Sequence, residues 1–338
     1  INLELTLLSQ LRNMISQREL FYSYIAQTSP EPMDLDIEKA EGVHLIDSGG
    51  KKYVDLISGI SVSNVGHCNP RVVNAIQEQS KKYMHLMVYG EYIQAPQNQL
   101  AESICKLLPE TLNNVYFVNS GSEAIEGALK LAKRYTGRTE IISCKNAYHG
   151  SSHGALSIMG NEDFKNNFRP LLPQTRLIQY NKFEDLQHIT TNTAAIVIEA
   201  FQAEAGIILP EKGYIQAVRE KCNEVGALMV VDEIQTGFGR TGTFFGFEQH
   251  GITPDIITLA KGMGGGMPIG AFISKKEIMQ KLTHNPVLGH ITTFGGNAVS
   301  CAASLACLQE IEENKLIENV KNLSPIFLKH LKHPEIVE

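Results

Sequence analysis

From about residue 97 onward, short apolar runs alternate with helical stretches, and this alternation restricts the possible folds more than any other feature. The apolar runs cover residues 114–118, 140–144, 176–180, 194–198, 227–231, 255–259 and 270–273. Helical patterns such as 97–108, 123–135 and 213–225 separate several of them. Apolar strands between helices predict an α/β domain with a mainly parallel sheet and helices on both faces. Ligands of such a sheet bind at the carboxyl ends of its strands.

The first third of the chain shows a different pattern. Residues 1–40 predict a helix and a proline-containing connection at 29–32, and short strands are expected at 44–46 and 52–56. A helix that begins at Pro70 is expected to reach residue 83. The first residues are apolar but lack a basic lead, so we expect no signal peptide there.

Composition excludes several classes of protein. The 338 residues carry a net charge of −6, which argues against a general nucleic-acid or anionic-membrane binder. No apolar run reaches the roughly 18 residues of a membrane-spanning helix. The six cysteines form no C-x-x-C pair and show no zinc spacing, so we expect reduced thiols and a cytoplasmic protein without a metal site.

The segment Asn119–Ala124 places a turn of small residues between a strand and a helix. Free backbone amides and the macrodipole at a helix N-terminus favour an anion such as a phosphate. Gly121 lets a ligand approach the backbone, and the hydroxyl groups of Ser120 and Ser122 can donate hydrogen bonds. An ordinary serine cap without a ligand is the alternative.

Asp232 ends the apolar run 227–231, which a sheet covered on both faces would bury. A carboxylate in that position is costly unless it meets a cation or a strong hydrogen-bond donor. A protonated ring nitrogen, an arginine or a metal ion would serve. The alternative is a capping aspartate at a strand end.

Lys261 closely follows the run 255–259 and precedes a glycine-rich turn. Lysine is rarely buried, and desolvation would lower its pKa and make it a nucleophilic amine, as Schiff-base lysines require. The alternative is a lysine that reaches from a strand edge into solvent.

The segment Gly237–Gly242 matches the G-x-G-x-x-G pattern of dinucleotide-binding proteins. That pattern binds a dinucleotide only where a strand turns at once into a helix. Here residues 232–236 intervene and residues 243–246 do not begin a helix, so nicotinamide binding is not expected.

Taken together and in this order, the three sites resemble the class III pyridoxal-phosphate-dependent aminotransferases, which include the ornithine, acetylornithine and 4-aminobutyrate enzymes. The resemblance runs from about Tyr53 to Cys307 and is densest in Val231–Gly242, which Lys261-Gly262 follows after a strand. It implies a fold-type-I transferase, with a large α/β domain and a smaller α+β domain, and pyridoxal 5'-phosphate (PLP) as the cofactor.

The resemblance also implies where the domains lie. Residues 1–65 would contribute to the small domain, and residues 66–300 would form the large PLP-binding domain. Residues 301–338 would begin a C-terminal small domain that is incomplete in this chain.

The resemblance assigns roles to individual residues. Lys261 matches the lysine that forms the Schiff base with PLP. Asp232 matches the partner of the pyridine nitrogen, which makes the ring an electron sink. Ile234 and Tyr148 would pack on the two ring faces, and Gln235 would reach the ring hydroxyl. The remaining cofactor positions are Ser120, Gly121, Ser122, Glu199 and Glu233.

Further positions relate to the substrate and to a partner subunit. Thr292–Asn297 resembles the family segment that crosses the dimer interface, which implies a homodimer with shared active sites. Thr293 would touch the phosphate of the partner subunit's cofactor, and Thr292 would face the substrate. Glu204 matches the residue that pairs with an arginine in glutamate-using members. Many members have arginine where this chain has Ser151, and that arginine holds a substrate carboxylate.

These assignments predict a transaminase that works by a ping-pong mechanism on small-molecule substrates. We expect it to move an amino group, a terminal one on an ornithine-like or diamine donor, to a 2-oxo acid, with 2-oxoglutarate favoured by Glu204. The alternatives are an ω-amine:pyruvate transaminase, a glutamate-1-semialdehyde-type aminomutase, a decarboxylating member and an inactive truncated homologue.

Overall fold

The computed structural model of the protein describes residues 16–331, and the chain divides into two compact units. Unit 1 comprises the residues up to Leu56 together with Gly66–Cys68. Unit 2 comprises Ile57–Val65 and the residues from Asn69 onward. The expectation that no signal peptide is present concerns residues outside the described part. The three-part domain division expected from the resemblance stays a prediction.

Unit 1 contains a short helix and a small antiparallel sheet. The elements are α2 Gln17–Tyr24, β1 Ile37–Glu41, β2 His44–Asp47 and β3 Lys52–Val54, with the strands in the order β1-β2-β3. Ser16 and Glu19 form a capping box that starts α2. The predicted strands at 44–46 and 52–56 are confirmed. We did not predict β1, because its mostly exposed and charged residues carry no apolar pattern.

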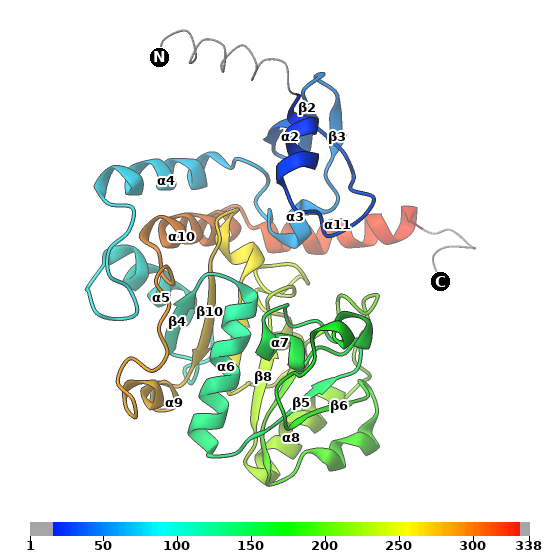
Figure 1. The fold of residues 1–338 in the computed structure, drawn as a ribbon, viewed down its shortest axis with the longest axis vertical. Helices are drawn as coiled ribbons and strands as arrows, with labels where there is room; N and C mark the ends of the chain where they lie inside the picture. The colour runs from blue at the N-terminus through cyan, green and yellow to red at the C-terminus, as the bar shows by residue number, and fades with distance from the viewer. Residues whose placement is uncertain (1–15, 332–338) are drawn as a thin grey trace. The chain divides into compact units, whose positions relative to one another are not determined.

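Unit 2 is built on a seven-stranded sheet with the order β4-β10-β9-β8-β7-β5-β6 (Figure 1). Its strands are β4 Asn114–Val118, β5 Glu140–Cys144, β6 Thr175–Ile178, β7 Thr193–Glu199, β8 Leu228–Asp232, β9 Ile256–Leu259 and β10 Gly270–Ser274. Only β10 pairs antiparallel with its neighbours, and the other pairings are parallel. The predicted strands and the mainly parallel α/β fold are confirmed.

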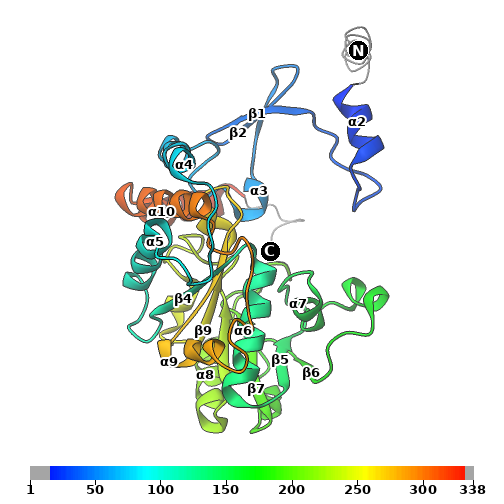
Figure 2. The same ribbon diagram turned by 60° about the vertical axis from the view of Figure 1, so that its left-hand side comes forward.

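Helices and short 3₁₀ turns connect these strands (Figures 1 and 2). The α-helices of unit 2 are α3 Ser58–Ser61, α4 Pro70–Lys82, α5 Ala95–Lys106, α6 Gly121–Thr136, α7 His153–Ser157, α8 Tyr214–Val225, α9 Lys276–Met279, α10 Ala298–Glu313 and α11 Leu316–His330. The 3₁₀ turns are η1 Glu162–Phe164, η2 Asn166–Phe168, η3 Phe183–His188, η4 Gly246–His250, η5 Lys261–Gly264 and η6 Gln280–Thr283. The helices predicted over 70–83, 97–108, 123–135 and 213–225 therefore form, with ends within about two residues of the prediction.

Two apolar cores lie on opposite faces of the seven-stranded sheet. In β7, Ala195 and Val197 join the core that contains residues of α6, α7 and α9, whereas Ile196 and Ile198 join the core that contains residues of α5, α8 and α10. Successive side chains of a strand point to opposite faces, so a strand covered on both sides must be apolar throughout. This explains the continuous apolar runs in the sequence.

No helix within residues 16–331 is both long and apolar enough to span a membrane. Within the same residues, no three His, Cys, Asp or Glu side chains gather closely enough to hold a metal ion.

Candidate active site

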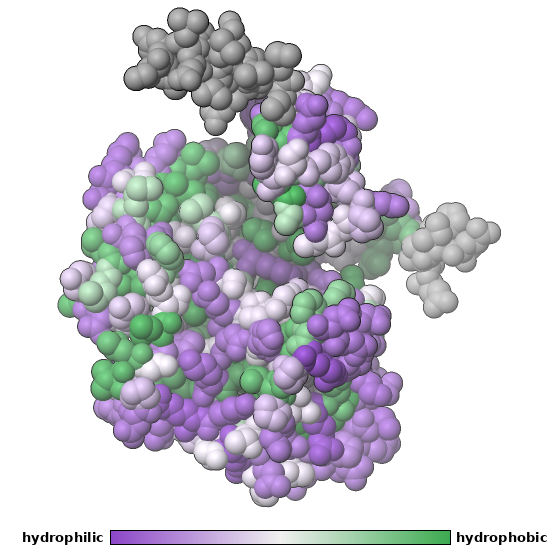
Figure 3. Space-filling model, in the orientation of Figure 1, coloured by the Kyte–Doolittle hydropathy of each residue, from purple (hydrophilic) through white to green (hydrophobic). Residues whose placement is uncertain are grey.

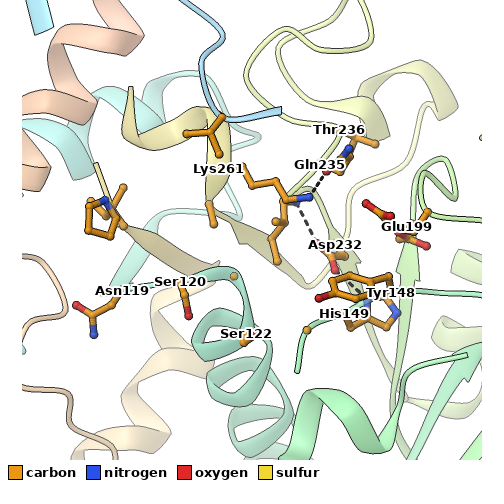
Figure 4. A pocket seen from close by; sticks show the side chains of 18 of the residues that line it. Asn119, Ser120, Ser122, Tyr148, His149, Glu199, Asp232, Gln235, Thr236 and Lys261 are labelled. Atoms are coloured by element: carbon orange, nitrogen blue, oxygen red, sulfur yellow. Dashed lines mark hydrogen bonds and ion pairs between the residues drawn. The ribbon is translucent and has the colours of Figure 1, made fainter. Parts of the chain in front are cut away.

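A cavity of about 440 Å³ lies in unit 2, at the carboxyl ends of its parallel strands (Figure 4). Its walls come from the ends of β7 and β8, the segment after β9, and the N-terminus of α6. The predicted site residues that line it are Ser120, Gly121, Ser122, Tyr148, Glu199, Glu204, Asp232, Ile234, Gln235 and Lys261. The fold thus brings together residues that are up to about 140 positions apart in the sequence.

Lys261 enters the cavity from the start of η5, separated from the end of β9 by one residue. Its backbone φ is 47°, in the left-handed region that non-glycine residues seldom adopt. Its Nζ donates a hydrogen bond to Oε1 of Gln235, and Nε2 of Gln235 donates to Oγ of Ser61 at 3.0 Å. Burial lowers the pKa of the Lys261 amine, although Asp232 and Glu204 act in the opposite direction. These features favour a nucleophilic amine over a lysine that extends into solvent.

Asp232 is the last residue of β8, and its carboxylate is held on both oxygens. Oδ1 accepts a hydrogen bond from the amide of Ile234 at 3.0 Å. Oδ2 lies 2.8 Å from Nδ1 of His149, so the imidazole ring donates that proton to the carboxylate (Figure 4). Both side chains are buried. The contacts fix the orientation of Asp232 at the cavity wall.

His149 is the functional candidate that we did not predict from the sequence. It also lines the cavity, and its Nε2 is buried without a hydrogen-bond partner within the described residues. It directly follows Tyr148, which the resemblance places on a face of the cofactor ring, and this position was the available signal. No local pattern indicates that it meets Asp232, which lies 83 residues further along the chain.

Glu199 ends β7 and lies opposite Asp232 in the parallel β7–β8 pair. Burial, together with the nearby carboxylates of Asp232 and Glu204, raises its pKa from the ordinary 4.5 to about 9. The Glu199 side chain is therefore protonated at neutral pH. A protonated carboxyl group can donate a hydrogen bond into the cavity.

The pKa of Glu199 leads to a prediction on stability. Between pH 4.5 and about 9, the folded protein holds a proton that the unfolded chain releases, so raising the pH through this window destabilises the fold by up to about 1.4 kcal/mol per pH unit. Glu199→Gln removes this titration. Thermal unfolding of protein without added cofactor should show the variant gaining about 1 kcal/mol or more on the parent between pH 5.5 and 7.5. Glu211→Gln, at an exposed position, is the control, and a gain of the same size there would contradict the assignment.

The N-terminus of α6 forms the part of the cavity suited to an anion. Ser120 caps the helix, since its Oγ accepts from the amide of Glu123 at 3.2 Å, and the amides of the first turn have no partner within a helix. A Cβ atom on Gly121 would lie 2.8 Å from Cδ1 of Ile234. A Cβ on Gly150, whose φ is 126°, would lie 2.2 Å from Oγ of Ser122. Position 150 therefore requires glycine, whereas a larger residue at position 121 would displace the Ile234 side chain.

Ser151 and Tyr148 lie together at the edge of this site. The Tyr148 hydroxyl is 3.3 Å from Oγ of Ser151, and the Ser151 amide donates to Oγ of Ser122 at 3.2 Å. Ser151 is exposed and is not among the residues that line the cavity. Ser151 lies close enough to the N-terminus of α6 for a longer side chain at this position to reach the cavity.

Three other predicted residues do not line the cavity. Glu233 is buried, and its carboxylate accepts from the Thr236 hydroxyl at 2.6 Å and from the amides of Gly246 and Phe247 at 2.9 and 2.7 Å. Glu233 therefore holds the start of η4. Thr292 accepts from Nδ2 of Asn119, a cavity residue, at 2.8 Å. Thr293 is exposed.

The glycine pattern at 237–242 occurs in turns between β8 and η4, with positive φ at Gly239 and Gly242. No helix starts within it. The strand-to-helix turn that a dinucleotide fingerprint requires is therefore absent from this segment.

A lysine and an aspartate at neighbouring strand ends face one cavity beside a helix N-terminus, an arrangement that can hold an anionic ligand next to a nucleophilic amine. The chain belongs to the class-III aminotransferase family, whose model matches residues 24–335. The resemblance seen in the sequence is thereby confirmed. The protein is an aminotransferase, an enzyme that moves an amino group from a donor to a 2-oxo acid.

Relatives with this activity share much of the sequence. The acetylornithine aminotransferase of Archaeoglobus fulgidus is 40% identical over 297 residues, which are 88% of this chain and 77% of that protein. Ornithine aminotransferase 1 of Staphylococcus aureus is 39% identical over 330 residues, with 93% and 82% of the two chains covered.

Solved structures of aminotransferases superpose on most of this chain. The ornithine aminotransferase of Toxoplasma gondii superposes with a TM-score of 0.87 at 28% identity, over 94% of this chain and 77% of that one. The taurine:2-oxoglutarate aminotransferase of Bifidobacterium kashiwanohense, solved in complex with PLP and glutamate, has a TM-score of 0.85 at 30% identity, over 94% and 76%.

Proposed function

We propose that the protein binds PLP in this cavity and transfers the terminal amino group of an ornithine-like or diamine donor to 2-oxoglutarate. The observation that carries the proposal is that Lys261 and Asp232 line one cavity from neighbouring strand ends, beside the N-terminus of α6. The amine, the carboxylate and the anion-binding helix end match three functional groups of PLP: its aldehyde, its ring nitrogen and its phosphate.

The other residues of the cavity also fit this cofactor. The amides of the first turn of α6 and the hydroxyl groups of Ser120 and Ser122 would hold the phosphate. Ile234 and Tyr148 supply apolar surfaces for the ring, and Gln235 can bond its hydroxyl group. Oε2 of Glu199 is buried without a hydrogen-bond partner in the described part of the chain, as is Nε2 of His149. Unpaired buried polar atoms are rare in proteins and support a ligand in this space.

PLP, when bound, supplies an electron sink that stabilises negative charge on the carbon next to the transferred amino group. Asp232 would pair with the ring nitrogen and keep it protonated, and the contacts from His149 and the Ile234 amide hold the Asp232 carboxyl group in place. Lys261, with a lowered pKa, can act as the nucleophile that attaches the cofactor and as the base that moves a proton at the substrate carbon. The Gln235–Ser61 pair would orient the amine before it reacts.

Three observations support the proposed substrates. The relatives described above are named for acetylornithine and ornithine, and one solved neighbour acts with 2-oxoglutarate. Glu204 lines the cavity, as expected for a member that uses glutamate. A second neighbour, the ω-transaminase of Thermomicrobium roseum, keeps an ω-amine:pyruvate transaminase as the alternative.

A matrix of donors and acceptors tests the proposal. Ornithine, N-acetylornithine, a diamine and 4-aminobutyrate are each paired with 2-oxoglutarate and with pyruvate, in the presence of PLP. We expect the largest kcat/KM for an ornithine-like or diamine donor with 2-oxoglutarate. Preference for pyruvate would favour the ω-amine alternative. Turnover of no pair, despite bound PLP, would favour an inactive homologue.

A homodimer with shared active sites is part of the proposal. Apolar side chains around Thr292 and Thr293 are exposed in the single chain, and a patch of this kind is typical of an interface. They are Val287, Leu288, Ile291 and Phe294. Sedimentation of the protein should give the mass of two chains, and a monomer with full activity would contradict shared sites. A cytoplasmic location stays a prediction from the sequence.

Ser151→Arg should change the choice of donor. A charged hydrogen bond to a substrate carboxylate is worth about 1.5–3 kcal/mol, so kcat/KM for 4-aminobutyrate relative to a diamine should rise by about tenfold or more. Ser151→Gln adds similar bulk without charge and should leave the ratio nearly unchanged. If both variants behave alike, or if the parent enzyme already prefers 4-aminobutyrate, position 151 does not contribute to donor selection.

A further inference from the structure

A second cavity, of about 400 Å³, lies at the opposite end of α6 from the active site. Lys130, Lys133, Arg134 and Arg138 line one side of it, and the loop around His290 lines the other. We call it the α6 C-terminal cavity. Figure 3 shows hydrophilic surface over this end of α6. Because α6 has 16 residues and each adds 1.5 Å, the two cavities are separated by roughly 20 Å along the helix.

The four cations of this cavity lack acidic partners. Its lining contains no Asp or Glu, and no ion pair within residues 16–331 involves any of the four. The nearest carboxylates in sequence bond elsewhere. Glu126 accepts from the hydroxyl of Ser152 and from the amides of Gly154 and Ala155. Glu140 pairs with Arg176. In a protein with a net charge of −6, such a group of unbalanced cations is unexpected.

Two of the four cations, Arg138 and Lys130, are held in position by uncharged partners. Nη1 of Arg138 donates to the backbone carbonyl groups of Thr193, Val225 and Gly226, each at 3.0 Å. Nζ of Lys130 lies 2.9 Å from Nδ1 of His290. Burial and the Lys130 charge lower the pKa of His290 to about 4, so at neutral pH the ring is uncharged and accepts from the ammonium group. Neither cation is neutralised by its partner.

The helix macrodipole alone does not account for this arrangement. Cations are favoured within the last turn of a helix, which would explain Lys133 and Arg134. Lys130 lies about two turns before the C-cap Gly137, and Arg138 lies beyond it, yet both face the same cavity. The spacing 130, 133 and 134 places three cations on one helix face, toward one space, rather than around the helix end.

We propose that the α6 C-terminal cavity binds a small phosphate-bearing anion. Two guanidinium and two ammonium groups match the oxygens of a phosphate, since arginine binds them in pairs and lysine as a point charge. Prior fixation of Arg138 lowers the cost of ordering the site when the anion binds. This site lies outside the active-site cavity, and its loop side, Gly289 and His290, belongs to the segment that carries the apolar patch proposed as the dimer interface.

Calorimetric titration of the PLP-loaded enzyme with pyrophosphate, at constant ionic strength, tests the proposal. We expect one site per chain in the parent enzyme, and a loss of affinity of about tenfold or more in the double variant K133Q/R134Q. The double variant K81Q/K82Q is the matched control, because it also removes two cations from the last turn of a helix, α4. It should bind pyrophosphate as the parent does, and both variants should keep the basal transaminase activity.

Several results would overturn the proposal. They are the absence of binding to the parent enzyme, equal weakening in both double variants, or succinate binding as tightly as pyrophosphate. The visible absorption of the bound cofactor is recorded during each titration, and its loss on addition of pyrophosphate would place the binding in the active site instead. Circular dichroism spectra that match the parent show that K133Q/R134Q is folded, so a change in its affinity reports on the cavity.

Discussion

Replacing Lys261 by Ala should lower kcat for transamination by at least about a thousandfold. The Lys261 amine would serve both as the group that attaches the cofactor and as the base that moves a proton, and positioned acid–base catalysis alone typically contributes a factor of about 10²–10⁴. Burial lowers the pKa of this amine, which increases the fraction of free amine relative to an exposed lysine. Stopped assays with saturating donor and 2-oxoglutarate measure the effect.

A covalent test accompanies the kinetic one. Borohydride reduction of the parent enzyme with PLP should remove its visible absorption and fix the cofactor on the peptide that contains Lys261. Lys275→Ala is the matched control, because Lys275 also lies just after a strand, β10, but is exposed. It should keep both activity and labelling. A cofactor fixed on any lysine other than Lys261 would disprove the assignment.

Asp232→Asn should retain the cofactor and lose about a hundredfold or more of kcat. A neutral amide cannot hold a ring nitrogen protonated by its charge, and removal of one preorganised electrostatic contact typically costs 10²–10³ in rate. The size of the side chain is unchanged, and one oxygen remains to accept from the Ile234 amide. The measurement pairs kcat with the affinity for PLP, since only kcat should change strongly.

His149 provides a graded comparison for Asp232. It acts through the carboxylate, so His149→Gln should reduce kcat less than Asp232→Asn and should shift the pH profile of kcat. A merely structural histidine would change stability without moving that profile. If Asp232→Asn turns over at the parent rate, the aspartate is a structural residue and another group must partner the ring nitrogen.

Most of the fold of unit 2 could be predicted, because its signals are local. The run at 227–231 became β8 at Leu228–Asp232, and the helix predicted for 123–135 became α6 at Gly121–Thr136. Apolar runs, serine and asparagine caps, and helix-ending glycines act within a few residues of the positions they determine. β1 carries no apolar run of this kind, since it is held mainly by its pairing with β2, and it was not predicted.

In the candidate site, too, features with a local signal could be predicted and those that depend on distant contacts could not. Lys261 and Asp232 could be identified because a charged residue at the end of a buried strand stands out in the sequence itself. The direction in which the Glu233 side chain points could not be predicted from the sequence. It follows Asp232 immediately, yet its side chain turns to the amides of Gly246 and Phe247, which lie more than ten residues further on.

The sequence by itself therefore determined which segments become strands and helices, and which edge of the sheet carries the reactive residues, because periodicity, capping and strand-end charges are local properties. Only the tertiary structure decided which carboxyl groups share the cavity. The parallel pairing of β7 with β8 sets Glu199 opposite Asp232, and the chain must close over 83 residues to bring His149 to the same carboxylate. Contacts of this kind depend on the packing of the whole sheet, and so do the burial that raises the pKa of Glu199 and the burial that lowers that of Lys261.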